Sequence, residues 1–153
     1  MTRFTTLLMG IGFSVVCLMP AAAWADHTFI GAEKCKMCHR LQYESWAVTK
    51  HANTWTALKA NEKTKVECVS CHSTNGAELP SVQCEACHGA GSDYKALAIM
   101  KNRGKAIAAG LILPDEAYCT SKCHNPKSQT FKGFNFRAAV LKVHNHKVSA
   151  ASK

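Results

Sequence analysis

The sequence predicts a mainly α-helical fold with little or no β structure. Three observations support this class. Residues 40–50 contain neither glycine nor proline, no segment shows the period-two alternation of a strand, and turn signals separate the helical stretches. A chain of 153 residues has the size of one small domain. Helices are expected at residues 39–59, 92–109, 114–122 and 136–147.

Each expected helix has a local signal. The first contains the uninterrupted stretch named above, and the second follows the turn Gly89-Ala90-Gly91. The third begins at Pro114-Asp115-Glu116, because proline and acidic residues favour the first helical turn. The fourth is amphipathic through Val140, Leu141 and Val143. The other expected turns are at Asn75-Gly76, Leu79-Pro80, Leu113-Pro114 and Asn125-Pro126.

The first 25 residues have the features of a secretory signal peptide. Arg3 supplies a positive charge, residues 4–19 form an apolar run, and Ala23-Trp24-Ala25 is a suitable cleavage site. We expect residues 1–25 to be removed together with Cys17, leaving residues 26–153 as one domain in the periplasm or outside the cell. An uncleaved anchor is the alternative, but the run is shorter than the roughly 20 residues of a membrane span. No later stretch is long enough to span a membrane.

The eight cysteines beyond residue 25 form four pairs, each followed directly by a histidine. The pattern is C-x-x-C-H in the first three motifs and C-x-x-x-C-H in the fourth. The members are Cys35, Cys38 and His39; Cys68, Cys71 and His72; Cys84, Cys87 and His88; and Cys119, Cys123 and His124. An even number of cysteines in a small exported chain ordinarily indicates disulfides. Disulfides, however, do not require the adjacent histidine.

C-x-x-C-H is the attachment motif of c-type haem. Two thiols on one helical turn bond to the vinyl groups of one porphyrin, and the adjacent histidine ligates the iron from the proximal side. The sequence therefore predicts four covalently bound haems c, with the four adjacent histidines as proximal ligands. A zinc site is the alternative, but it leaves these histidines without a role. For the fourth motif, a single thioether or a disulfide between Cys119 and Cys123 is also considered.

Four haems change the interpretation of size and charge. Residues 26–153 provide only 32 residues per haem, so the haems themselves are expected to form the core, and the chain without them is not expected to fold. The formal charge of +9 first suggests nucleic acid as a partner. Propionates of four haems would nearly neutralise that charge, so no nucleic-acid binding is expected.

The other four histidines are candidates for the distal side of the irons. His51 follows His39 by 12 residues, about 18 Å along a helix, so it would ligate a neighbouring haem and not its own. Of His144 and His146, only one is expected to ligate a given iron. His27, close to the expected cleavage site, is either a residue of a mobile tail or a ligand to an iron in another molecule, which would link molecules together.

Three stretches of sequence carry information beyond the bare motifs. Gly31–Ala52, Val82–Tyr94 and the closing Val143-His144-Asn145-His146 resemble the cytochrome c-554 family, tetrahaem proteins of exported electron-transfer systems. The resemblance implies four closely packed haems, mostly with two histidine ligands, inside a helical wrapper. It also implies that His51 caps the third haem, that His144 caps the fourth, and that the second haem lacks a distal protein ligand.

The chain departs from the family pattern in three places. Only 11 residues separate His72 from Cys84, so loops around the second haem are missing. The family's histidine after the Gly-x-Gly segment, which caps the first haem, is absent from residues 92–101. Met100 is the candidate replacement and would raise the reduction potential of that haem; alternatively, it packs with Leu97 and Ile99 against the porphyrin. The spacing of the fourth motif is the third departure.

These observations predict an electron-transfer protein that works with redox partner proteins. The alternative is an enzyme that reduces nitric oxide, hydroxylamine or nitrite at a five-coordinate haem. Its nearest candidate proton donors are Glu67, Glu85 and His146, and no classical acid–base constellation accompanies them. The carrier is therefore the favoured interpretation, and self-association through His27 is a third hypothesis.

Overall fold

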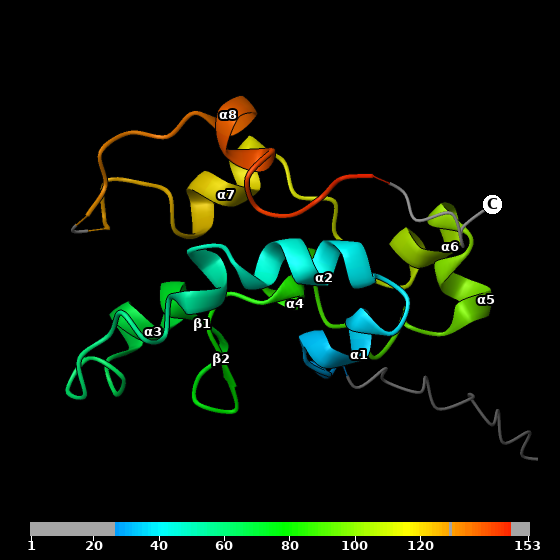
Figure 1. The fold of residues 1–153 in the computed structure, drawn as a ribbon, viewed down its shortest axis with the longest axis horizontal. Coiled ribbons are helices and arrows are strands. Elements are labelled where there is room, and N and C mark those ends of the chain that lie inside the picture. The colour runs from blue at the N-terminus through cyan, green and yellow to red at the C-terminus, as the bar shows by residue number, and fades with distance from the viewer. Residues whose placement is uncertain (1–26, 129, 148–153) are drawn as a thin grey trace, which may run out of the picture.

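The computed structural model describes residues 27–128 and 130–147, which are mostly helical (Figure 1). The expected signal peptide and Cys17 lie outside the described residues. In chain order the helices are α1 (Ala32–Lys36), α2 (Arg40–Ala47), the 3-10 turn η1 (His51–Asn53), α3 (Val66–His72), α4 (Cys84–His88), α5 (Leu97–Met100), α6 (Arg103–Ala108), α7 (Glu116–Lys122) and α8 (Phe136–Val140). The mainly α prediction is confirmed.

The β structure of the described residues is one small antiparallel hairpin. Its strands are β1 (Ser73–Asn75) and β2 (Leu79–Pro80), with Ser73 opposite Pro80. Gly76, in the turn predicted at Asn75-Gly76, has a positive φ of 55°, a conformation that glycine adopts without a steric penalty. This hairpin agrees with the expectation of little or no β structure.

The predicted helix at residues 39–59 is too long. α2 ends at Ala47, and η1 follows after a turn. Hydroxyl and amide side chains explain the break, because they compete with the helical backbone bonds. Thr49 Oγ1 donates to the carbonyl of Trp46 at 2.7 Å, and Asn53 Nδ2 donates to the carbonyl of Thr49 at 2.9 Å. The break places His51 in a turn and not on the axis of α2.

Asn and Asp side chains set the starts of three later helices. Oδ1 of Asn102, Asp115 and Asn135 accepts the N–H of the third residue that follows, at 2.8–3.0 Å, which is N-capping. The predicted helix at 92–109 is therefore divided into α5 and α6, with Asn102 at the division. α7 agrees with the prediction at 114–122 to within two residues, whereas α8 ends at Val140, well before the predicted residue 147.

The polypeptide provides little apolar core of its own. Among the described residues, the buried apolar side chains are Ala32, Leu58, Tyr94 and Ala106. Large apolar side chains such as Val66 and Leu141 are 80% and 73% exposed. A chain of this size normally buries a continuous cluster of such side chains. The helices therefore leave apolar surface that only another component can cover.

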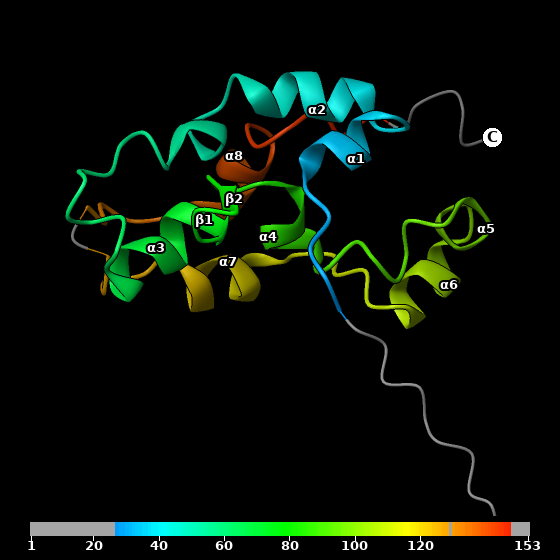
Figure 2. The same cartoon turned by 90° about the horizontal axis from the view of Figure 1, so that it is seen from below.

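The helices are arranged around α4. Figure 2 shows α4 between the pair α1–α2 on one side and α7 on the other, with α3 and the hairpin at one end and α5–α6 at the opposite end. None of the helices in the described part of the chain is both long and apolar enough to span a membrane. The central position of α4 brings the third motif close to residues from the other motifs.

Candidate haem-binding site

Each of the four motifs lies on a helix or on the turn that directly follows one. α3 and α4 each contain a complete motif. α1 contains Cys35, and the following turn carries Cys38 and His39; α7 contains Cys119, and Cys123 is its C-cap. All eight cysteines are free thiols, including Cys119 and Cys123. Short helices with paired thiols fit the geometry that covalent haem attachment needs.

The fourth motif absorbs its extra residue in a wider helical turn. In the first motif, the N–H of His39 donates to the carbonyl of Cys35, four residues earlier, at 2.8 Å. In the fourth motif, the N–H of His124 donates to the carbonyl of Cys119, five residues earlier, at 3.1 Å. This i→i+5 bond is the local signature of a π-type turn. The histidine therefore still follows the second cysteine within one continuous turn.

Backbone carbonyls fix the ring orientation of two proximal histidines. Nδ1 of His72 lies 2.8 Å from the carbonyl of Thr54, and Nδ1 of His88 lies 3.0 Å from the carbonyl of Ile112. A carbonyl only accepts, so each Nδ1 carries a proton, and Nε2 is the nitrogen available to ligate iron. Iron-ligating histidines are typically held in this way. Neither carbonyl could be foreseen from the sequence, because both come from outside the motifs.

Two pairs of imidazoles from distant parts of the sequence lie close together. The ring centroids of His51 and His124 are 6.0 Å apart, and those of His88 and His144 are 6.1 Å apart. Two metal–nitrogen bonds of about 2 Å, plus about 1 Å from each nitrogen to its ring centre, give a separation of about 6 Å. Each pair therefore has the spacing of two axial ligands on one iron.

The pairing differs from the one that the family resemblance implies. The resemblance places His51 opposite His88 and His144 opposite His124, whereas the structure places His51 beside His124 and His144 beside His88. The early end of α2 accounts for the position of His51, since η1 turns the chain away from the α2 axis. Thr54 then anchors this turn, because its Oγ1 hydrogen-bonds with the carbonyls of His51 and His72, both at 3.1 Å.

Burial lowers the pKa of three of these four imidazoles, which favours their neutral form. Burial, with repulsion from His124, lowers the pKa of His51, and burial lowers the pKa of His124. Burial likewise lowers the pKa of His144, with a smaller contribution from His146 and His88. A neutral imidazole is the form that binds a metal. Phe134, which the sequence did not single out, stacks on His124 with centroids 4.4 Å apart.

The remaining candidates for distal ligands, which are His146, His27 and Met100, lie in other environments. Nε2 of His146 is 2.7 Å from the carbonyl of Val140, which engages that nitrogen. His27 forms an ion pair with Asp93 of the same chain. Met100 is half-buried in α5, which lies at the end of the molecule opposite α3 (Figure 2). No ring contact within residues 27–128 and 130–147 places an imidazole against His39 or His72.

Thiols of different motifs approach one another. A hydrogen bond between the thiols of Cys35 and Cys84 raises the pKa of Cys35 and lowers that of Cys84. Burial and a hydrogen bond from Cys71 raise the pKa of Cys123 to about 12. Burial, followed by the charge of Cys119, raises the pKa of Cys87 to about 11. The attachment points of the first and third, third and fourth, and second and fourth motifs are therefore neighbours.

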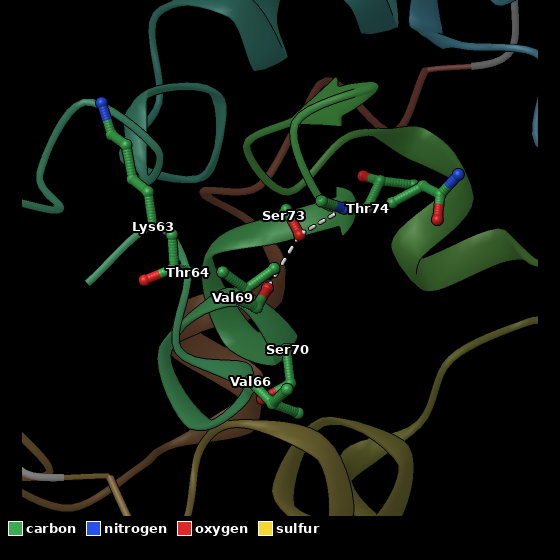
Figure 3. A pocket seen from close by; sticks show the side chains of 9 residues that line it. Lys63, Thr64, Val66, Val69, Ser70, Ser73 and Thr74 are labelled. Carbon is green, nitrogen blue, oxygen red and sulfur yellow. Dashed lines mark hydrogen bonds between the residues drawn. The ribbon is translucent and has the colours of Figure 1, made fainter. Parts of the chain in front are cut away.

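A surface pocket of about 350 Å³ flanks α3 (Figure 3). Val66, Val69, Ser70 and Ser73 contribute to its lining, and their spacing puts them on one helical face. Cys68, Cys71 and His72 lie on the opposite face. Ser73 Oγ closes the pocket floor by donating to the carbonyl of Val69 at 2.8 Å and accepting the N–H of Gly76 at 2.9 Å. The pocket is therefore behind the second motif, on the side away from its thiols.

The residues fit haem better than zinc. No group of three or more His, Cys, Asp or Glu side chains converges on a single metal position in the described part of the chain, whereas a structural zinc site needs four ligands in a tetrahedron. The thiols occur instead as pairs beside a histidine, and two of the proximal imidazoles face a second imidazole. Helices, paired thiols and opposed histidines together define the class of c-type cytochromes.

Comparison with known proteins gives the same class. Residues 34–89, which include the first three motifs, match the family of cytochrome c554 and c-prime. A curated relative, cytochrome c-554 of Nitrosomonas europaea, is 30% identical over 99 residues, which cover 46% of this chain and 42% of the relative. No solved structure matches. Residues 34–89 are therefore similar to the cytochrome c-554 family, whose cofactor is heme c, and the matched region spans less than half the length of the curated relative.

Proposed function

We propose that the protein is an exported tetrahaem c-type cytochrome that carries electrons between redox partner proteins in the periplasm or outside the cell. The observation that carries this proposal is the two pairs of neighbouring imidazoles, with ring centroids 6.0 and 6.1 Å apart. Two histidines on one iron keep the metal low-spin and leave no position for a substrate, which suits electron transfer.

The residues that would hold each haem follow from the motifs. Two cysteines and one proximal histidine of each motif attach one haem, with His124 and His51 on the fourth iron and His88 and His144 on the third. When bound, each haem supplies an iron that gains or loses one electron between the ferric and ferrous states. The carbonyls of Thr54 and Ile112 hold the His72 and His88 rings in the protonation state that ligation needs.

The contacts between thiols support a spatial order that differs from the sequence order. Cys35 neighbours Cys84, Cys87 neighbours Cys119, and Cys123 neighbours Cys71. Because each thiol marks an edge of its own haem, the haems would follow one another as first, third, fourth and second. Electrons would enter or leave at the first and second haems, at the two ends of the molecule.

Intact mass and electron paramagnetic resonance of the matured protein test this proposal. We expect the mass of residues 26–153 with four covalently attached haems, and at least two low-spin signals with two imidazole ligands. A mass with three haems would remove the fourth motif from the proposal. Substrate-dependent turnover of nitric oxide, hydroxylamine or nitrite at a high-spin haem would favour the reductase instead.

A further inference from the structure

Glu85 is a carboxylate buried between two of the four motifs. It occupies the first variable position of the third motif, on α4, and is only 2% exposed. Its Oε1 and Oε2 lie 2.9 and 3.0 Å from the N–H of Ile30. Oε2 also accepts the N–H of Gly31 at 2.7 Å, and Oε1 accepts the N–H of Gly91 at 2.6 Å. Three backbone amides therefore converge on this side chain.

The three amides come from both sides of the carboxylate. Ile30 and Gly31 directly precede α1, the helix of the first motif, whereas Gly91 follows the third motif. A Cβ on Gly91 would lie 2.9 Å from Oε1 of Glu85, so this close approach requires glycine. Gln83 adds a parallel contact, because its Oε1 accepts the N–H of Ala32 at 2.8 Å. Glu85 thus joins the segment of the first motif to that of the third.

The hydrogen bonds of Glu85 fit an ionised carboxylate. The partners of its two oxygens are the backbone N–H groups of Ile30, Gly31 and Gly91, none of which could accept the proton of a neutral carboxyl. None of the three ion pairs found in the described residues includes Glu85. The backbone amides of Ile30, Gly31 and Gly91 stabilise the charge of Glu85. This charge also acts on Tyr94, whose pKa is raised by burial and then by Cys35 and Glu85.

We propose that Glu85 is a positioning residue whose fixed negative charge lowers the reduction potentials of the first and third haems relative to the other two. Reduction adds an electron to each site, and a buried anion nearby opposes that addition more strongly than an exposed one. This inference rests on the proposed function only in placing haems at the first and third motifs. Cys84 directly precedes Glu85 on α4, and the amides of Ile30 and Gly31 that Glu85 accepts directly precede α1, which carries Cys35.

Redox titration of the haem-loaded protein tests the proposal. Glu85→Gln removes the charge at constant size, and we expect two of the four potentials to become more positive. Glu67→Gln is the matched control, because Glu67 is an exposed carboxylate directly before Cys68, and water screens its charge; we expect no shift there. Glu85→Asp keeps the charge and is expected to keep the two potentials close to wild type.

The Gln83→Glu variant and the intact mass of each protein complete the test. If Glu85→Gln does not retain its haems, Gln83→Glu adds a charge at the same junction and should make the same two potentials more negative. Unshifted potentials in fully loaded Glu85→Gln, an equal shift in Glu85→Asp, or no shift in Gln83→Glu would each overturn the proposal. Intact mass is measured in parallel. Fewer than four haems in wild type contradicts the proposed function, whereas four haems with unshifted potentials contradicts only the role of Glu85.

Discussion

The third and fourth motifs differ from the first and second in what lies opposite the proximal histidine. His88 and His124 each face a second imidazole at about the spacing of two ligands on one iron. His39 and His72 have no such ring contact within the described residues. The same short motif therefore occurs in two settings. In the proposed function, a motif would supply three bonds to its haem, and a distant segment of the chain would decide whether the iron has a sixth ligand.

The largest expected effect comes from removing a distal imidazole. His51→Ala should convert the fourth haem from low-spin to high-spin, because no other imidazole is placed against His124 in the described residues. Electron paramagnetic resonance would show the loss of one low-spin haem signal. His144→Ala should do the same at the third haem. His146→Ala is the control and should leave the spectrum unchanged, since the Val140 carbonyl engages its Nε2.

The pairing itself can be tested with a chain that lacks the fourth haem. In a Cys119→Ala, Cys123→Ala background, the additional change His51→Ala should produce no new high-spin signal, because its iron is already gone. A new high-spin third haem would restore the pairing that the family resemblance implies. Intact mass confirms that three haems remain before the comparison is made.

Carbon monoxide should bind only where the distal side is open. We expect the ferrous protein to bind it at the second haem and not at the third or fourth, as followed in the visible spectrum. Met100→Ala should extend binding to the first haem, because Met100 is the side chain that the sequence offers for that position. Binding of carbon monoxide at all four haems would contradict the expected difference between the second haem and the third and fourth haems.

A smaller effect is expected from pH. The buried imidazoles of His51 and His144 have lowered pKa values in the folded protein, whereas an unfolded histidine protonates near about 6.5. Between the lowered pKa and about 6.5, the unfolded chain binds more protons, so the free energy of unfolding falls as the pH falls through this window. Denaturant titrations should show a free energy of unfolding that does not change with pH above this window and declines within it. The decline should be shallower in the His51→Ala variant. An equal slope in both proteins would contradict this assignment.

The smallest effect should follow from His27→Ala. His27 is largely exposed and pairs with Asp93 of its own chain, which lowers the pKa of that carboxyl. We therefore expect the haem spectrum and the size of the particle in solution to stay as in wild type. Loss of a wild-type oligomer in this variant, measured by light scattering, would instead show that His27 caps a haem in a neighbouring molecule.

The sequence predicts the motifs and the helical class well because both depend on local chemistry. Adjacent residues form a motif, and a cap such as Asp115 acts within one turn. The sequence does not predict the pairing of His51 with His124, because Thr49 bonds to the end of α2 and Thr54 anchors the turn that follows, which together redirect the chain. The contacts made by the carbonyl of Ile112 and by the amides around Glu85 could not be predicted either. Every residue carries the same backbone groups, so the sequence does not show which of them will meet a given side chain.

The crossed contacts of His51 and His144 also bear on how the protein would respond to proteolysis. His51 comes from the first half of the chain and lies against the fourth motif, while His144 comes from its end and lies against the third. Lys127 and Lys132 lie between His124 and His144, and the described residues around them form neither helix nor strand. A protease that cuts there would leave His51 and the fourth motif on one fragment and His144 on the other, so the fragments would stay joined through His144 on the iron of the third haem. The nicked protein would migrate as one particle until that metal bond was broken.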